Sequence, residues 1–473
     1  MVDIPFPVAT TKDSPERAGS GKLINAILEQ IPDGRVIRKR APGVAQFATS
    51  ASGASHCRGM LLANENEVLV AYDGALEVVN AIGGSTYLGV LSGAGLATMA
   101  RNLKAPTPDI VIVANNIAYV ANTTGPPAPY PDLTIGNPNS VCYGDGYFFF
   151  TYLSGECQAS AINDTTLDPL DAIQVNSSSS SLLRGVYYAQ TLYLFTEDTT
   201  EAWTNTANPT GFPFSRSAVI PRGLLSPFAV AGFEAKFTSS LLFVGSDSIV
   251  YLMNGYSPVR VSNSDIERRI SSVADKSTLR ASVHVSEGHA IWQLTSSDFT
   301  LCFDVTNTYW FERKSEGSEF SRMECSVYAF GGWLVGDRST GVVGRVSANA
   351  FSEYGATLTW AVQSLPVDKF PSYTIVRRAD FNFVVGIGLD PPHEPLDLVT
   401  DYASDPQISV SWSDDGGATF NMPVLRALGK VGRDIQSITV LRSGQSTRYG
   451  RVWRVEVSDP CYVGLLSANM EMR

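Results

Sequence analysis

The residues best suited to chemistry in this chain are its four histidines and six cysteines. Imidazole and thiolate groups are common in catalytic and metal sites because they exchange protons or bind metals near neutral pH. His56 and Cys57 are adjacent and could pair as base and nucleophile, but neighbouring side chains rarely face each other. No histidine belongs to an H-E-x-x-H motif, and no cysteines form a C-x-x-C pair. We therefore predict no catalytic residue, no metal site, and thiols that are mostly reduced and buried.

Two histidines flank a predicted turn. His284 and His289 lie on either side of Ser286-Glu287-Gly288, whose residue types favour a turn between strands. Side chains beside such turns are usually solvated, so we expect both imidazoles at the surface.

One short run resembles a phosphate-binding loop. Gly19-Ser20-Gly21-Lys22 matches the end of that motif, but Glu16 stands where its first glycine belongs and Leu23 where serine or threonine is needed. The sequence also lacks the nucleophile elbow G-x-S-x-G. We predict a protein that uses no cofactor and is not an enzyme.

The sharpest local motif lies close to the C-terminus. Ser413-Asp414-Asp415-Gly416-Gly417-Ala418-Thr419-Phe420 fits S-x-D-x-G-x-x-[W/F] and is similar to the Asp-box pattern of sialidases and other β proteins. In such a turn, serine and aspartate side chains bond the backbone, glycine adopts a positive φ, and the aromatic ring can cover the hairpin. We therefore assign Ser413, Asp415, Gly417 and Phe420 to a structural turn.

The elements that would hold these residues are mostly β-hairpins. Apolar strands meet at short turns such as Asp73-Gly74 and Asn115-Asn116, residue types that tolerate the positive φ of two-residue hairpin loops. The pattern recurs with starts 37 to 49 residues apart, at Val68, Ile110, Tyr147, Leu192, Leu241, Ala290 and Trp333. Such spacing is typical of four-stranded blades, so we predict a six- or seven-bladed β-propeller. An irregular β-sandwich with accidental spacing is the alternative.

Helical patterns are few. Ser264 and Glu267 have the spacing of a capping box ahead of an apolar face, which predicts a helix over 265–274. Apolar residues four positions apart in 23–28 make 14–28 a second candidate helix.

The composition changes near Phe351, beyond which alternating and β-branched runs lose the regular hairpin spacing. We predict a separate C-terminal β-sandwich there, with a long loop over 390–406. The fold class is then all-β and has three parts. These are an N-terminal arm over 1–55 that can pack on the C-terminal domain, a β-propeller over 56–350 and a β-sandwich domain over 351–473.

Composition excludes several classes of protein. Of 473 residues, 44% are hydrophobic and only 17% are charged, which argues against a disordered chain. The net charge of −11 argues against binding of duplex DNA by a basic face, because phosphate contacts need Lys and Arg. Residues 78–100 carry no charge, but five glycines and five Asn, Ser or Thr make this stretch too polar for a membrane helix. The start of the chain lacks the pattern of a signal peptide, so we expect no membrane insertion.

Several short segments, taken in order, resemble one known family. The chain is similar to the tail hub, or nozzle, proteins of short-tailed bacteriophages, also called packaged-DNA stabilisation proteins. The resemblance spans about residues 23–473 and is carried by Leu23-Ile24-Asn25, Ala41-Pro42-Gly43, Ser160-Ala161-Ile162-Asn163-Asp164, Glu201-Ala202-Trp203, Gly211-Phe212-Pro213-Phe214, Pro258-Val259-Arg260-Val261-Ser262 with Ile266-Glu267, Phe303-Asp304 with Trp310, Val335-Gly336-Asp337 with Gly341, and Trp412-Ser413-Asp414-Asp415-Gly416-Gly417.

The resemblance implies a structural protein of the phage tail, present in the virion and assembled in the host cytoplasm. It implies a homo-oligomeric ring, typically a hexamer, below the portal and its head-to-tail adaptor ring. Such hubs extend the DNA channel, retain the packaged genome with a tail needle or plug until genome ejection, and support tailspikes or fibres. Six copies at −11 each would carry about −66, and an acidic lumen would let DNA pass as cargo without sticking. Ordinary solubility explains the same charge equally well.

Two other functions stay open at this point. A carbohydrate-active or carbohydrate-binding propeller, such as a sialidase-like enzyme, would need clustered carboxylates and arginines. Asp337 and Arg338 are such a pair, although their surroundings resemble a turn. An adhesin that binds the host surface would need exposed aromatic patches, which the sequence cannot place.

Overall fold

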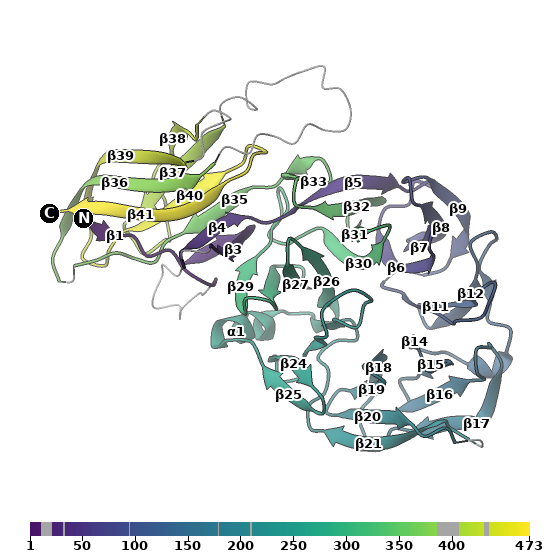
Figure 1. Ribbon diagram of the computed structural model, residues 1–473. Coiled ribbons are helices and arrows are strands. Elements are labelled where there is room, and N and C mark those ends of the chain that lie inside the picture. Colours follow the sequence, from purple (N-terminus) through teal and green to yellow (C-terminus); the bar gives the residue numbers. More distant parts are fainter. Residues whose placement is uncertain are drawn as a thin grey trace. The chain divides into compact units, whose positions relative to one another are not determined.

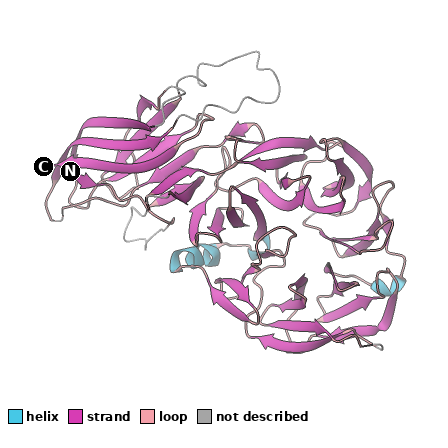
Figure 2. Cartoon of the chain, in the orientation of Figure 1, coloured by secondary structure: helices cyan, strands magenta, loops and turns pink. Residues whose placement is uncertain are grey.

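The computed structural model of the protein consists largely of β-strands joined by turns and loops (Figure 1). It describes residues 1–10, 21–31, 34–93, 95–177, 179–208, 211–369, 371–385, 406–429 and 435–473. Figure 2 shows strands throughout and little helix, which confirms the all-β prediction. The chain separates into two compact units, which we call the blade unit (46–297 and 322–346) and the terminal unit (1–45, 298–321 and 347–473).

Sheets of four antiparallel strands make up most of the blade unit. The first three are β6 (Cys57–Asn64), β7 (Glu67–Tyr72), β8 (Gly74–Asn80) and β9 (Ser85–Leu91); β10 (Thr98–Arg101), β11 (Ile110–Ala114), β12 (Ile117–Ala121) and β13 (Ala128–Pro129); and β14 (Ser140–Gly144), β15 (Tyr147–Thr151), β16 (Glu156–Ser160) and β17 (Leu167–Gln174). Two more are β18 (Leu182–Tyr188), β19 (Thr191–Thr196), β20 (Thr200–Asn205) and β21 (Phe214–Ile220); and β22 (Val230–Ala231), β23 (Leu242–Val244), β24 (Val250–Asn254) and β25 (Ser257–Arg260).

Two further sets of strands belong to the same unit. They are the pair β26 (Arg280–Ser286) and β27 (His289–Thr295), and the three strands β30 (Met323–Ala329), β31 (Gly332–Asp337) and β32 (Val342–Ser347). The sheets of the blade unit lie around a common centre, with strands such as β6, β14 and β18 on the inside and β9, β17 and β21 on the outside (Figure 1). This is the arrangement of a β-propeller.

The middle strands of these sheets are buried on both faces. Phe148 and Phe150 pack in the hydrophobic cluster toward β11, whereas Phe149 between them packs in the cluster toward β19. Successive side chains of a strand point to opposite faces, so one apolar run fills two interfaces between sheets. This explains why the hairpins appear as continuous apolar segments in the sequence.

The predicted two-residue turns are confirmed. Tyr72 pairs with Ala75 across Asp73-Gly74, and Gly74 has a φ of 76°. Ala114 pairs with Ile117 across Asn115-Asn116, whose φ values are 51° and 59°. The Asn115-Asn116 turn, with a positive φ at both positions, matches the right-handed twist of the strands that it joins.

The helix predicted over 265–274 is confirmed as α1 (Ser264–Ser272), but the predicted cap is shifted by one residue. The N-cap is Asn263, whose side chain accepts hydrogen bonds from the backbone N–H groups of Asp265 and Ile266. Short 3₁₀ turns occur at η1 (Leu133–Ile135) and η2 (Lys276–Thr278).

The charge-free stretch 78–100 folds into parts of β8 and β10 together with all of β9. None of the helices in the described parts of the chain is long and apolar enough to cross a membrane.

The terminal unit contains two larger sheets. One has the order β3 (Ala26–Gln30), β4 (Val36–Arg40), β41 (Gly464–Met472), β36 (Thr374–Val384) and β39 (Ile435–Ser446), with β1 (Val2–Asp3) beside β41. The other has the order β28 (Thr300–Asp304), β29 (Tyr309–Glu312), β2 (Lys22–Ile24), β35 (Trp360–Gln363), β40 (Val452–Val457), β37 (Gln407–Ser413) and β38 (Val424–Ala427). A small hairpin, β33 (Ser352–Glu353) and β34 (Ala356–Thr357), pairs in parallel with β5 (Gly43–Thr49).

Aromatic rings connect the two sheets of the terminal unit. The ring centroids of Phe381 on β36 and Trp453 on β40 are 5.5 Å apart, and those of Phe383 and Trp360 are 6.5 Å apart. All four side chains are fully buried. They form a core between sheets to which the N-terminal strands also belong, because β1 and β4 pair with β41 and β2 pairs with β35.

The second predicted helix, over 14–28, is wrong where the structure describes it, namely over 21–28. Residues 22–24 and 26–30 form β2 and β3, separated by Asn25 with a φ of 50°. The buried Asn25 side chain donates to the carbonyls of Lys314 (2.9 Å) and Thr359 (2.8 Å), which holds this bend in place. Apolar residues four positions apart fit two short strands as well as a helix, and pairing with distant strands decides between them. Residues 11–20 and the predicted loop over 390–405 lie outside the described residues.

Candidate functional site

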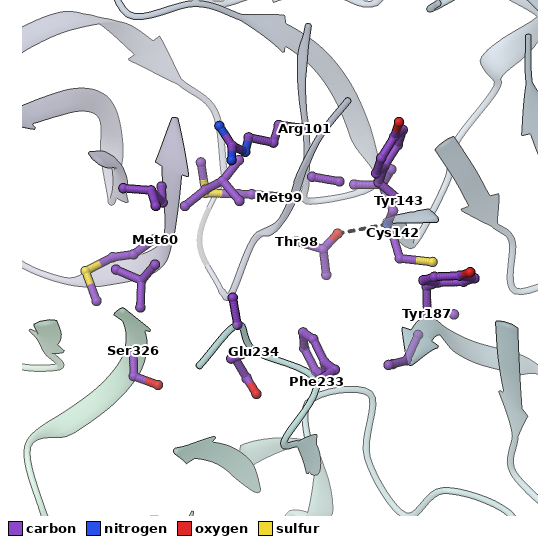
Figure 3. A pocket seen from close by; sticks show the side chains of 18 of the residues that line it. Met60, Thr98, Met99, Arg101, Cys142, Tyr143, Tyr187, Phe233, Glu234 and Ser326 are labelled. Atoms are coloured by element: carbon purple, nitrogen blue, oxygen red, sulfur yellow. Dashed lines mark hydrogen bonds between the residues drawn. The ribbon is translucent and has the colours of Figure 1, made fainter. Parts of the chain in front are cut away.

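A central cavity of about 340 Å³ lies in the blade unit (Figure 3). Inner strands of the surrounding sheets line it, together with the segment 233–235. An adjoining cavity of about 120 Å³ shares Met60, Met99 and Arg184 with it. The inner strands β6, β10, β14, β18 and β30 therefore enclose the most promising place for a ligand in the described blade unit.

The polar groups at this cavity are largely held by the protein itself. Thr98 Oγ1 accepts a hydrogen bond from the backbone N–H of Val141 (3.0 Å), as the dashed line in Figure 3 shows. Ser326 Oγ accepts from the N–H of Val283 (3.3 Å), and Arg101 donates to the carbonyl of Ala63 (2.7 Å). Groups engaged in this way stabilise the contacts between neighbouring sheets.

Two charged residues at the cavity are partly desolvated. The Arg184 guanidinium lies 5.0 Å from the ring centroid of Phe228 and 5.4 Å from that of Phe233, and it donates to the carbonyl of Pro227. Burial lowers the pKa of Arg184 to about 10. Burial also raises the pKa of Glu234, whose carboxylate accepts from the N–H of Gly232 at 2.6 Å. The cavity thus combines a cation that stacks on aromatic rings with a carboxylate bound by the backbone, and neither has the free, convergent geometry of an acid–base pair.

A charged cluster consists of His56 and Asp73 near the first sheet of the unit, Glu324 on β30 of the last sheet, and Arg280 on β26. The buried Glu324 carboxylate pairs with both His56 and Arg280. His56 Nδ1 lies 3.3 Å from Asp73 Oδ2. A buried carboxylate needs such partners because an unpaired charge in the interior is strongly destabilising.

His56 and Cys57 do not form a base and nucleophile pair. The His56 ring contacts Glu324 and Asp73, whereas the Cys57 thiol faces Cys325, with 3.0 Å between the two Sγ atoms. All six cysteines are free thiols, four of them buried and Cys142 and Cys325 half-buried. The prediction of mostly buried thiols is confirmed.

The expectation for the hairpin histidines is half right. His284 and His289 lie on β26 and β27 on either side of the turn, as predicted, but their side chains are buried and not solvated. The local sequence pattern did not reveal this burial. His393 lies outside the described residues.

Asp337 and Arg338 lie at a turn, and their side chains bind other parts of the protein. The buried Asp337 carboxylate pairs with Arg322 and accepts from the N–H of Ser339 (2.8 Å), while Arg338 donates to the carbonyl of Ser296 (3.1 Å). Both side chains are engaged with the protein, so they do not form an open site for an anionic sugar.

The Asp-box segment connects two paired strands of the terminal unit, β37 and β38. Ser413 Oγ donates to Asp415 Oδ1 (2.5 Å) and accepts from the N–H of Gly417 (2.8 Å). The Asp415 carboxylate also accepts from the N–H and hydroxyl groups of Thr419. These hydrogen bonds lower the pKa of Asp415, first through Ser413 and then through Thr419. The Arg454 guanidinium lies over the Phe420 ring, 5.6 Å from the ring centroid.

Sequence reasoning missed the central cavity and the charged cluster. Their residues come from strands up to 268 positions apart, as with His56 and Glu324. The only available signal was the hairpin period, which predicts inner strands but not which of their side chains converge. Among the described residues, no three His, Cys, Asp or Glu side chains are grouped so that they could hold a metal ion.

The ring of antiparallel sheets places this chain among the β-propeller proteins. A family model described as "Bacteriophage P22 Gp10, beta-propeller" matches residues 24–350, more than half of the chain. The chain belongs to this family, and it is a phage structural protein.

The comparisons with curated proteins and with solved structures add little to this family assignment. No curated protein matches the sequence. Similar solved structures include the WD40 β-propeller domain of Doa1, at 10% identity and a TM-score of 0.43 over 65% of this chain and 97% of that chain. A streptogramin B lyase has 11% identity and a TM-score of 0.44 over 64% of this chain and 96% of its own. The virginiamycin B lyase from Staphylococcus aureus has 8% identity and a TM-score of 0.43 over 62% of this chain and 94% of its own. At such low values these likenesses do not bear on function.

Proposed function

We propose that this protein is the tail hub, or nozzle, of a short-tailed phage. The observation that carries the proposal is the family match over residues 24–350. In this role the protein extends the DNA channel below the portal and adaptor ring and retains the packaged genome until ejection. It acts as a structural part of the virion tail and not as an enzyme.

The proposed architecture is a seven-bladed propeller over 56–350 and a β-sandwich over 351–473. The seven sets of strands in the blade unit, five of them with four strands, support this blade count. The ring contacts of Phe381 with Trp453 and of Phe383 with Trp360 support a sandwich. We propose that 1–55 is an arm on the C-terminal domain, which the pairing of β1 and β4 with β41 supports.

The proposed assembly is a homo-oligomeric ring, a hexamer in the form that the family resemblance implies. With a net charge of −11 per copy, such a ring would repel phosphates, and DNA would pass through as cargo. The ring would contact the head-to-tail adaptor on one side and a needle or plug, tailspikes or fibres elsewhere. We propose that Ser413, Asp415, Gly417 and Phe420 serve as a structural turn in the terminal unit.

Electron microscopy tests this proposal. We expect the full-length protein, alone or mixed with its adaptor ring, to form closed rings, and we expect antibodies against it to label the tail of intact particles. A protein that stays monomeric with and without the adaptor and is absent from purified particles would overturn the proposal. The same preparation should not retain duplex DNA in a gel-shift assay at about 150 mM salt, since few phosphate contacts are available to an acidic surface.

A further inference from the structure

Two thiols meet where the first and last sheets of the blade unit come together. Cys57 is the first residue of β6, and Cys325 lies on β30. Their Sγ atoms are 3.0 Å apart although the residues are separated by 268 positions. Both strands are the first of their sheets, so the two sulfurs lie at the seam between the beginning and the end of the unit.

The surrounding core leaves space for these two sulfurs. Cys57 is fully buried in the hydrophobic cluster that joins β6–β8 to β30–β32, and Cys325 packs against the same cluster. Gly336 on β31 faces both thiols, and a methyl group at this position would overlap the sulfurs of Cys57 and Cys325. Glycine at 336 thus keeps the thiol pair in contact.

One of the two thiols is accessible. Cys325 is half-buried and lines the cavity of about 120 Å³ next to the central one. Cys57 is fully buried, and burial raises its pKa well above the usual value. A small oxidant therefore meets Cys325 first, and Cys57 is reached only through Cys325.

We propose that Cys57 and Cys325 form a disulfide when the protein leaves a reducing compartment. Cys325, as a thiolate, attacks a low-molecular-weight disulfide, which forms a mixed disulfide and releases one small thiolate. Cys57 then loses its proton to the released thiolate and attacks Cys325 Sγ, which releases the second small thiolate. Two protein thiols are oxidised to one disulfide, and one small disulfide is reduced to two small thiols.

The bond would join the two ends of the blade unit covalently. A disulfide restricts the unfolded chain more when it closes a longer loop, and the loop from 57 to 325 contains nearly the whole unit. Host cytoplasm keeps thiols reduced, whereas the medium outside the cell does not. The timing of oxidation in the virion rests on the proposed function, but the formation of the bond does not.

The test uses the full-length protein, purified with reductant, freed of it and incubated with oxidised glutathione. We expect the count of free thiols under denaturing conditions to fall from six to four. We also expect faster migration in a non-reducing gel and a cross-linked peptide containing Cys57 and Cys325. Thermal unfolding should shift to higher temperature, and dithiothreitol should reverse every change.

Two variants make the test specific. C325S should keep all its remaining thiols and should not shift in the gel. C142S is the matched control, because Cys142 is also half-buried and lines the central cavity, and it should still form the bond. If C325S does not fold, the peptide map of the wild-type protein still shows whether Cys57 and Cys325 are cross-linked.

Six thiols retained by the native protein, with oxidation only after denaturation, would overturn the proposal. So would a cross-link between any other pair. Neither result would affect the tail assignment, which depends on ring formation and particle labelling.

Discussion

Arg451 donates from Nε and Nη2 to the two carboxylate oxygens of Asp414, and both N–O distances are 2.8 Å. The guanidinium is almost fully buried, and it also lies 5.5 Å from the ring centroid of Trp412 and 5.7 Å from that of Trp453. Asp414 belongs to the Asp-box turn and Arg451 directly precedes β40. This bidentate pair therefore joins the turn to the aromatic core of the terminal unit.

Removing the carboxylate by D414A should leave the buried Arg451 without its main partner. We expect a loss of about 3 kcal/mol in the free energy of unfolding. This value is at the lower end of the range for breaking a buried ion pair, because Asp414 is itself partly exposed. Denaturation followed by tryptophan fluorescence would measure this. R378A, which breaks an exposed ion pair with Asp380, should cost less than about 1 kcal/mol. Equal losses in the two variants would contradict the assigned role of Arg451.

The lowered pKa of Asp415 predicts a pH dependence. Because the folded-state pKa lies below the unfolded value of about 4, ionised Asp415 contributes stability above that pH. The contribution is lost as the pH falls through the folded-state pKa, and it is modest because the carboxylate is exposed to solvent. The protection factors of the amides in 413–420, which are exchange rates corrected for the intrinsic effect of pH, should therefore fall on acidification toward pH 2. D415N should show low protection factors in this turn already at pH 7, and protection in D415N equal to that of the wild-type turn would argue against the assignment.

The cluster around Glu324 should tolerate substitution poorly. E324A removes the carboxylate that pairs with His56 and Arg280 in the interior of the blade unit. We expect a loss of about 3 kcal/mol or more in equilibrium denaturation. The matched control is E319A, because Glu319 pairs with Lys314 but is largely exposed, and we expect a change below about 1 kcal/mol. A small effect of E324A would mean that the cluster does not stabilise the seam.

A glycine on an inner strand should be sensitive to a single methyl group. A Cβ at Gly144 would overlap the ring of Tyr187 on the neighbouring sheet. G144A should therefore cost about 1–3 kcal/mol, as overpacking commonly does. At Gly332 the nearest atom to an added Cβ is 3.5 Å away, so G332A should change the stability by less than about 0.5 kcal/mol. Combining G144A with Y187A should give less than the sum of the two losses, since the variants share one contact.

Local features of this protein were readable from the sequence alone. The turns at Asp73-Gly74 and Asn115-Asn116 depend on the φ preferences of single residues, and α1 depends on a cap and an apolar face within one segment. The run Phe148-Phe149-Phe150 belongs to one of the predicted apolar hairpins, and alternation of its side chains places these rings in two interfaces. The period of the hairpins then predicted the propeller.

Tertiary structure decided what depends on partners far apart in the chain. Residues 22–30 are two strands and not a helix because β4, β29 and β35 supply backbone partners that the local pattern does not contain. His284 and His289 are buried although they flank a turn, and Cys57 contacts Cys325, which lies 268 positions further along the chain. Sequence periodicity reports which residue types repeat along one strand, whereas side-chain contacts depend on how separate strands pack. The sequence by itself therefore determined the class of fold and its turns, and packing between sheets determined the cavity, the charged cluster and the thiol pair.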